Sequence, residues 1–506
     1  MLRRDTRMGR MQPMSAKQSF ADPKRSLVGN TLWNLAGTFL PLLIGLVAVP
    51  LLLRSLGIER FGMLSLIWML TGYFGVLDLG LGRALTRLVA EQAEHARDDD
   101  LSRAIWTGLG MMSAFGIVGA AGLIVAAEPL VHGLLNVPEV LRQEAVGAIW
   151  FLAFSLPVAI AATGLRGVME GLHLFKLANL IRIPLAALTF LAPLAVTMVT
   201  PDLAVVSASL LGVRILGLIA HWVACVRAVP GIDRPRRPDR VLFRPLLAFG
   251  GWLTVTNVVG PLMTYLDRFV IGALANLAAV AYYATPYDFV TKLLVIPFAL
   301  TAVLFPMFSG SLARGSAESA ALMTRSLATV FAVIFPAVMF AVAFAREGLG
   351  LWLGEDFASH SFRVLQWLAA GVLVNSMALV PFTFVQGAGR PDWVAKLHLL
   401  ELPFYFLGLW WMLDVVGIVG AAITWTVRVT VDALVLVWMA HRAAPPGIKL
   451  PGQLVLVILL GLVVLLPAAL VDSALVRGLV AVAFAIVLPA LLWEHFHVLW
   501  HARSTK

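Results

Sequence analysis

Apolar runs of about 20 residues recur from one end of this 506-residue chain to the other, separated by short polar connections. A helix of that length crosses the hydrocarbon core of a bilayer. Lipid offers no hydrogen-bond partners, so a spanning segment must satisfy its own backbone, as a helix does. Only 13% of the residues are charged, about half the fraction in a typical soluble domain. The pattern therefore predicts an all-α polytopic membrane protein.

Counting these runs predicts about fourteen transmembrane helices. They lie at approximately residues 30–53, 62–81, 104–127, 146–165, 177–199, 203–226, 246–272, 279–308, 326–345, 363–387, 393–413, 415–440, 451–471 and 476–498.

The basic residues predict how these helices are oriented. Most of the 38 Lys and Arg residues fall in the N-terminal segment, in every second connection and in the C-terminal tail. The intervening connections hold only Arg54, Arg60, Arg142, Arg346, Arg363 and Arg477. By the positive-inside rule, both termini are then cytoplasmic, and the net charge of +10 reflects topology and contact with anionic lipid, with no nucleic acid needed. Tryptophans near span ends, such as Trp352, are expected in the interfacial belt.

The most basic connection, at residues 227–244, divides the chain into two six-helix halves. The expected segments are a basic N-terminal stretch (1–25), a first bundle (26–226), a basic cytoplasmic linker (227–245), a second bundle (246–440), and two further helices with a cytoplasmic tail (441–506). The helix that opens each half carries a proline at a similar depth, Pro41 and Pro261. Such matched interruptions often mark helices that bend around a central site, so both prolines are predicted hinges in two bundles related by a pseudo-twofold axis.

The sequence contains none of the motifs expected of an enzyme of this size. It has no P-loop, no zinc-ligand spacing, no Ser, His and Asp arrangement that spacing supports, and no connection long enough for a soluble catalytic domain. Its single cysteine, Cys225, excludes an intramolecular disulfide. We therefore expect a transporter rather than an enzyme, without a metal or a cofactor.

Three cations, Lys292, Arg214 and Arg428, lie about 15 to 20 Å from the ends of their predicted spans, close to the bilayer midplane. Ionised groups at that depth normally face a protein interior or a water-filled cavity. Three of them on three spans predict one shared electropositive chamber. Such a chamber suits a diphosphate, because guanidinium groups bind phosphate oxygens bidentately.

Acidic residues accompany these cations. Asp288 precedes Lys292 by four residues and so shares its helix face, in the favourable order for an ion pair. Arg428 and Asp432 share a face in the less favourable order. A purely structural role, in which each pair neutralises buried charge and locks neighbouring helices, stays open.

Other polar residues in the spans leave further alternatives open. The carboxylates of Asp78, Asp267 and Glu401 are compatible with export of an organic cation, which calls for unpaired acids. Asn34 and Asn257, on the two opening helices, either hydrogen-bond between helices or contact sugar hydroxyls.

Several segments resemble bacterial polysaccharide flippases. They include "RFGMLSLIWMLTGYFGVLDLGLGRALTRLVAE" at residues 60–91, "TNVVGPLMTYLDRFVIG" at 256–272 and "YYATPYDFVTKLLVIPFALTAVLFP" at 282–306. The family belongs to the multidrug, oligosaccharidyl-lipid and polysaccharide exporter superfamily. The resemblance implies two six-helix bundles around a central cavity that opens alternately to the two sides. Its cargo would be an undecaprenyl diphosphate-linked oligosaccharide, moved from the cytoplasmic to the periplasmic leaflet of a bacterial inner membrane during O-antigen, capsule or exopolysaccharide biosynthesis.

The expected site combines this resemblance with the depth argument. The expected substrate-binding residues are Lys292, Arg268, Arg428, Arg214, Asn34 and Asn257, and the expected charge-tuning or coupling residues are Asp288, Asp432, Asp267 and Asp78. Expected partners are the lipid-linked oligosaccharide, membrane lipids, a polysaccharide polymerase and assembly proteins, while a coupling ion, H⁺ or Na⁺, stays open. The alternatives are a lipid II flippase, a multidrug or cation antiporter, and a structural subunit of a polysaccharide assembly complex.

Overall fold

The computed structural model describes residues 23–73, 80–95, 98–229, 231–239, 241–243, 263, 265–314, 318–444, 475–479 and 482–484, with side chains from Leu40 onward. Within these residues the regular elements are all helices, and nine are long and apolar enough to cross a membrane. The prediction of an all-α membrane protein is therefore confirmed. The count of fourteen stays a prediction, because the thirteenth span, most of the seventh and most of the fourteenth lie outside the described residues.

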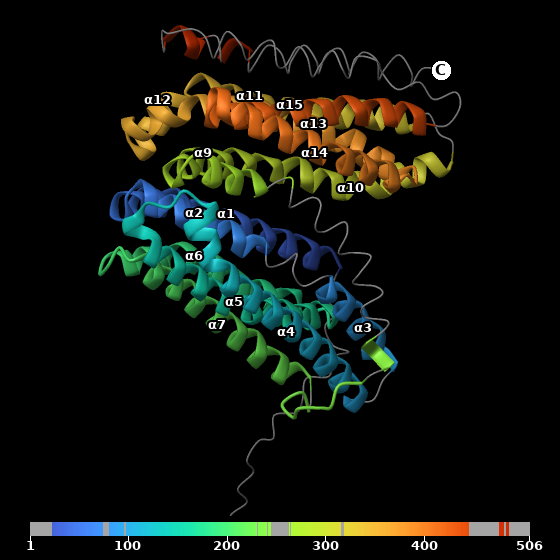
Figure 1. Ribbon diagram of the computed structural model, residues 1–506. Coiled ribbons are helices and arrows are strands. Elements are labelled where there is room, and N and C mark those ends of the chain that lie inside the picture. Colours follow the sequence, from blue (N-terminus) through green and yellow to red (C-terminus); the bar gives the residue numbers. More distant parts are fainter. Residues whose placement is uncertain are drawn as a thin grey trace, which may run out of the picture.

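Seven helices form the first half of the molecule (Figure 1). They are α1 (Pro23–Leu56), α2 (Ile58–Tyr73), α3 (Leu81–His95), α4 (Asp98–Pro129), α5 (Arg142–Gly171), α6 (Phe175–Thr197) and α7 (Leu203–Ala228). Helix α5 lies at the centre and packs against α2, α3, α4, α6 and α7. Asp202 starts α7 by accepting hydrogen bonds from the backbone N–H groups of Ala204 and Val205, a typical N-cap.

Helix α3 differs from the sequence expectation, which placed one span at residues 62–81. The structure describes α2 as far as Tyr73, and after the turn at Gly80 the helix α3 begins at Leu81. Helix α3 buries Leu85 and Val89 against α4 and α5 and exposes Arg83 and Arg87. A helix with one apolar and one charged face suits the surface of a bundle better than its interior.

The second half begins with a helical segment at residues 265–274. It continues with α9 (Leu277–Val290), the 3₁₀ segment η4 (Thr291–Leu294), α10 (Val295–Ala313), α11 (Glu318–Ala343), α12 (Ala345–Leu353), α13 (Glu355–Gly387), α14 (Pro391–Val416) and α15 (Ile418–Ala443). Helix α13 is its core and packs against all of α9 to α12, α14 and α15. Figure 1 shows these helices as a separate layer beside the first half.

The two halves touch at one end of the molecule, which we call the contact end. Helix α1 ends there at Leu56, α9 begins there at Leu277, and α12 ends there at Leu353. At Gly62 of α2, an added Cβ would lie 1.9 Å from the carbonyl oxygen of Leu277, so the two helices meet backbone to backbone. Four hydrogen bonds among the described residues cross here. Asn136 donates to Gly272, Ala273 and Ala275 carbonyls at 3.0, 2.8 and 3.0 Å, and Trp352 Nε1 donates to the Leu46 carbonyl at 2.6 Å.

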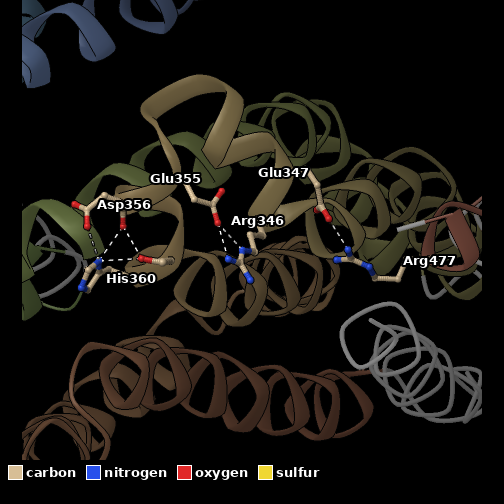
Figure 2. Close-up of polar contacts among 7 residues, drawn as sticks. Arg346, Glu347, Glu355, Asp356, His360 and Arg477 are labelled. Atoms are coloured by element: carbon tan, nitrogen blue, oxygen red, sulfur yellow. Dashed lines mark hydrogen bonds and ion pairs between the residues drawn. The ribbon is translucent and has the colours of Figure 1, made fainter. Parts of the chain in front are cut away.

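Charged residues tie the short helix α12 to its neighbours at this end (Figure 2). Arg346 binds Glu355 at the start of α13, with Nη2 to Oε1 at 2.6 Å. Arg477 forms an ion pair with Glu347 and donates through Nη1 to the Ala343 carbonyl at 2.9 Å. The described part of the C-terminal region is thereby docked on the second half.

Candidate functional site

A cavity of about 410 Å³ lies between the two halves, next to the contact end. Helices α1, α2 and α6 of the first half line one side, and the 265–268 segment, α9, η4, α10 and α12 line the other. Its size falls within the range typical of ligand cavities. We call it the central cavity.

Much of the wall of the central cavity is aromatic. Phe61, Trp68, Phe190, Tyr265, Phe289 and Trp352 line it. Trp68 packs edge-on against Phe61 and Phe190, with ring centroids 6.2 and 5.2 Å apart. Flat apolar rings beside the hydroxyl groups of Ser65, Thr71 and Thr285 can stack on sugar faces and bond their hydroxyls.

Arg268 and Asp288 form an ion pair on this wall. Both guanidinium Nη atoms reach the carboxylate, with Nη1 3.3 Å from Oδ2. Arg268 is almost fully buried and also lies 5.9 Å and 5.1 Å from the ring centroids of Tyr265 and Tyr287. The Asp288 side chain is half-exposed, so its outer edge faces the cavity. The pair contributes no net charge to the wall.

Lys292 is the exposed cation of the central cavity. It lies in η4, the 3₁₀ segment between α9 and α10, and no carboxylate of the described residues pairs with it. The expected Asp288 to Lys292 pair is therefore wrong. The i,i+4 rule holds for a continuous α-helix, whereas these two residues lie on opposite sides of an α to 3₁₀ junction. Pro286 and Pro297 flank the junction and lack the N–H that would continue the α-helical pattern.

Asp267 points away from the cavity into the second half. It is fully buried, and it accepts hydrogen bonds from the Tyr283 hydroxyl at 2.7 Å and from the Arg268 backbone N–H at 2.8 Å. The neighbouring Arg268 points in a different direction and lines the cavity, because adjacent residues of a helix are about 100° apart around its axis.

Arg428 and Asp432 lie in the interior of the second half. Arg428 Nη1 is 3.6 Å from the sulfur of Met263, and its guanidinium lies 5.8 Å from the Tyr405 ring centroid. Asp432 Oδ1 lies 3.4 Å from His398 Nε2 instead. Arg428 lines neither the central cavity nor the second cavity described next.

Arg214 lines a second cavity of about 270 Å³, whose wall is formed by α5, α6 and α7 of the first half. We call it the first-half cavity. Lys292, Arg214 and Arg428 thus occupy three different places, and the expectation of one chamber shared by all three is wrong. Thr189 of α6 lines both cavities, which makes them neighbours.

Pro41 lies inside α1 and lines the central cavity. Asn257, Asp78 and Pro261 lie outside the described residues, and of Asn34 only its place in α1 is described. Sequence reasoning missed Trp352 as a cavity residue and assigned it to the lipid interface. Its position at the end of α12, next to the acidic residues Glu355 and Asp356 that begin α13, was a signal that it could face another helix.

Residues 27–312, more than half of the chain, match the family model described as "Polysaccharide biosynthesis protein". The chain belongs to this family. It is 29% identical over 419 residues to a protein of Shigella flexneri named "Putative O-antigen transporter", covering 82% of this chain and 98% of that one.

Several solved structures have the same fold as this chain. An inward-facing multidrug resistance MATE transporter of the MOP superfamily matches with a TM-score of 0.68 and 14% identity, covering 82% of this chain and 94% of that one. The lipid II flippase MurJ in an inward closed conformation matches with a TM-score of 0.61 and 12% identity, covering 94% of this chain and all of that one. At these identities the likeness establishes the fold alone.

Proposed function

We propose that this protein is a flippase that moves an undecaprenyl diphosphate-linked oligosaccharide from the cytoplasmic to the periplasmic leaflet of a bacterial inner membrane. The observation that carries the proposal is the central cavity, which lies between two helical halves and presents one unpaired cation, Lys292. The polysaccharide biosynthesis family and the O-antigen transporter name of the Shigella relative support this class of cargo.

In this proposal the Lys292 ammonium binds the diphosphate. Arg268 is a second cation nearby. Its ion pair with Asp288 weakens its attraction for phosphate, so that the cargo can leave again. The first sugars lie against the aromatic wall, and the polyprenyl chain stays in lipid. A 410 Å³ cavity holds the diphosphate and the first sugars rather than a whole oligosaccharide, so the halves must separate further during transport.

The contact end supplies one gate of an alternating-access cycle. The backbone contact of α2 with α9 and the hydrogen bonds of Asn136 and Trp352 close the cavity there. Opening that end while the opposite end closes would expose the same cation to the other leaflet. Pro41, which lines the cavity, is placed to let α1 bend during this change.

The test is Lys292→Ala in a bacterium whose own flippase gene is deleted, with surface polysaccharide as the readout. Loss of one charge-assisted bond to phosphate should lower transport by about tenfold or more, and Lys292→Arg should retain it. The matched control is Lys396→Ala, because Lys396 is an exposed lysine of α14 that pairs locally with Asp392 at 3.1 Å. Normal transport by Lys292→Ala, at normal membrane abundance, would remove this residue from the site.

Glu401 favours a second candidate, a cation antiporter. Its carboxylate is buried in α14, and neither oxygen has a hydrogen-bond partner in the described structure. An antiporter would show efflux of cationic drugs that Glu401→Gln abolishes. A flippase would show drug susceptibility unchanged by the protein and transport that depends on Lys292.

A further inference from the structure

The first-half cavity concentrates positive charge, and none of the described residues of its wall is acidic. Arg166 of α5, Arg182 of α6, and Arg214 and His221 of α7 line it. Arg214, Gly217 and His221 follow each other at i, i+3 and i+7, so one face of α7 presents all three. Small residues open the space between the helices, among them Ala159, Ala162 and Ala186.

Two of these four groups lack a partner among the residues that the structure describes. Arg182 and Arg214 make no ion pair or hydrogen bond with any residue that the structure describes. Arg166 Nε lies 3.3 Å from Glu170, outside the cavity wall. The His221 ring is buried, its Nδ1 lies 2.7 Å from the Gly217 carbonyl oxygen, and its Nε2 has no partner. Arg182 is exposed, whereas Arg214 is partly buried, and an unpaired cation between membrane helices is costly unless water or an anion compensates it.

The cations are also spread along the depth of the bundle. Arg166 lies five residues before Gly171, the last residue of α5, which is about 8 Å from that helix end. Arg214 lies 14 residues before Ala228, the last residue of α7, which is about 21 Å from the same end of the bundle. The cavity therefore runs from near the end opposite the contact end to mid-depth. Thr189, which it shares with the central cavity, lies at the deep end.

We propose that the first-half cavity is an anion site that binds a phosphate or diphosphate group carried by a lipid. Arg214 reaches the phosphate from mid-depth, Arg182 and Arg166 reach it from nearer the membrane surface, and His221 Nε2 provides a further polar contact. The site is distinct from Lys292. Its use for transport cargo rests on the proposed flippase function, whereas its anion binding does not.

Binding of inorganic diphosphate to the purified full-length protein in phosphate-free detergent, followed by calorimetry, tests the anion site. Arg214→Gln should weaken the affinity by about tenfold, the effect of losing one charged contact. Arg314→Gln, which removes an exposed arginine paired with Glu318 in the second half, should leave it unchanged. Lys292→Ala should retain the diphosphate binding that Arg214→Gln weakens. Wild-type affinity in Arg214→Gln would overturn the proposal.

Arg214→Lys and Arg182→Gln keep the test decisive if Arg214→Gln does not fold, because unchanged affinity in both would also overturn the site. Native mass spectrometry with undecaprenyl diphosphate and with phosphatidylglycerol then identifies the carrier. If the protein retains either lipid, and this retention depends on Arg214, the result supports a phosphate that is carried by a lipid. Binding of inorganic diphosphate with neither lipid retained would overturn the lipid part. Normal transport by Lys292→Ala together with weakened diphosphate binding by Arg214→Gln would count against the proposed transport site alone.

Discussion

Replacing Asn136 with alanine removes two of the hydrogen bonds that join the halves at the contact end, those from Nδ2 to the Ala273 and Ala275 carbonyls. A hydrogen bond contributes about 0.5 to 1.5 kcal/mol net, so the closed contact end should lose about 1 to 3 kcal/mol. Since 1.4 kcal/mol is a factor of ten, the ratio of open to closed molecules should rise by about 5-fold to 150-fold. The backbone bond from Asn136 to Gly272 remains and limits the effect.

Distance measurements between two spin labels can follow this ratio. Val140 and Leu351 lie in different halves near the contact end and are highly exposed, so cysteines there should accept labels without disturbing the fold. The single native cysteine, Cys225, is buried and is replaced by alanine in all variants. In detergent, Asn136→Ala should increase the long-distance fraction relative to the parent protein.

Asp202→Ala is the matched control for this measurement. It removes the N-cap of α7 at the same end, at a cost of about 1 kcal/mol, but the hydrogen bonds it breaks lie within one half. The distance distribution should then stay that of the parent. The reasoning is refuted if Asn136→Ala leaves the distribution unchanged, or if Asp202→Ala shifts it equally.

Two further substitutions test the contacts around the central cavity. Gly62→Ala places a Cβ 1.9 Å from the Leu277 carbonyl oxygen, so α2 and α9 must separate, and the same label pair should report longer distances; an unchanged distribution would show that the helices accommodate the methyl group. Asp288→Asn leaves Arg268 buried without its carboxylate, and should lower stability by about 1 to 2 kcal/mol because Asp288 is half-exposed. Thermal unfolding in detergent measures this, and an unchanged midpoint would contradict the importance of the pair.

The spanning helices were predictable because the bilayer constrains each one locally. The prediction of 203–226 corresponds to α7 at Leu203–Ala228. The predicted start at residue 146 is later than the start of α5 at Arg142, because the pattern of basic residues assigns Arg142 to a connection between spans. In the structure Glu144 binds Arg60 of α2 through two hydrogen bonds of 2.7 and 2.9 Å, and pairing allows a charged residue to extend a helix.

The charge pairs of the site were not predictable in the same way. Periodicity shows which residues share a face of one helix, but tertiary packing decides which helix lies opposite. Arg268 therefore binds Asp288, 20 residues further along the chain, while Lys292 stays unpaired. Arg214 lies near the middle of α7, yet its position along the helix could not distinguish a cavity within one half from a cavity between the halves.

The four residues of η4 have a geometric consequence for the whole eighth predicted span. Each 3₁₀ residue turns the chain by about 120° rather than about 100°, so a helical wheel drawn from Leu277 falls about 80° out of phase beyond Leu294. Their larger rise also lengthens the span by about 2 Å. The buried face of α10, which includes Pro297, Leu304 and Phe308, thus lies about 80° from the direction that one continuous wheel would give it. If η4 became α-helical, α10 would rotate about its own axis. This rotation would move the Lys292 ammonium without tilting either half.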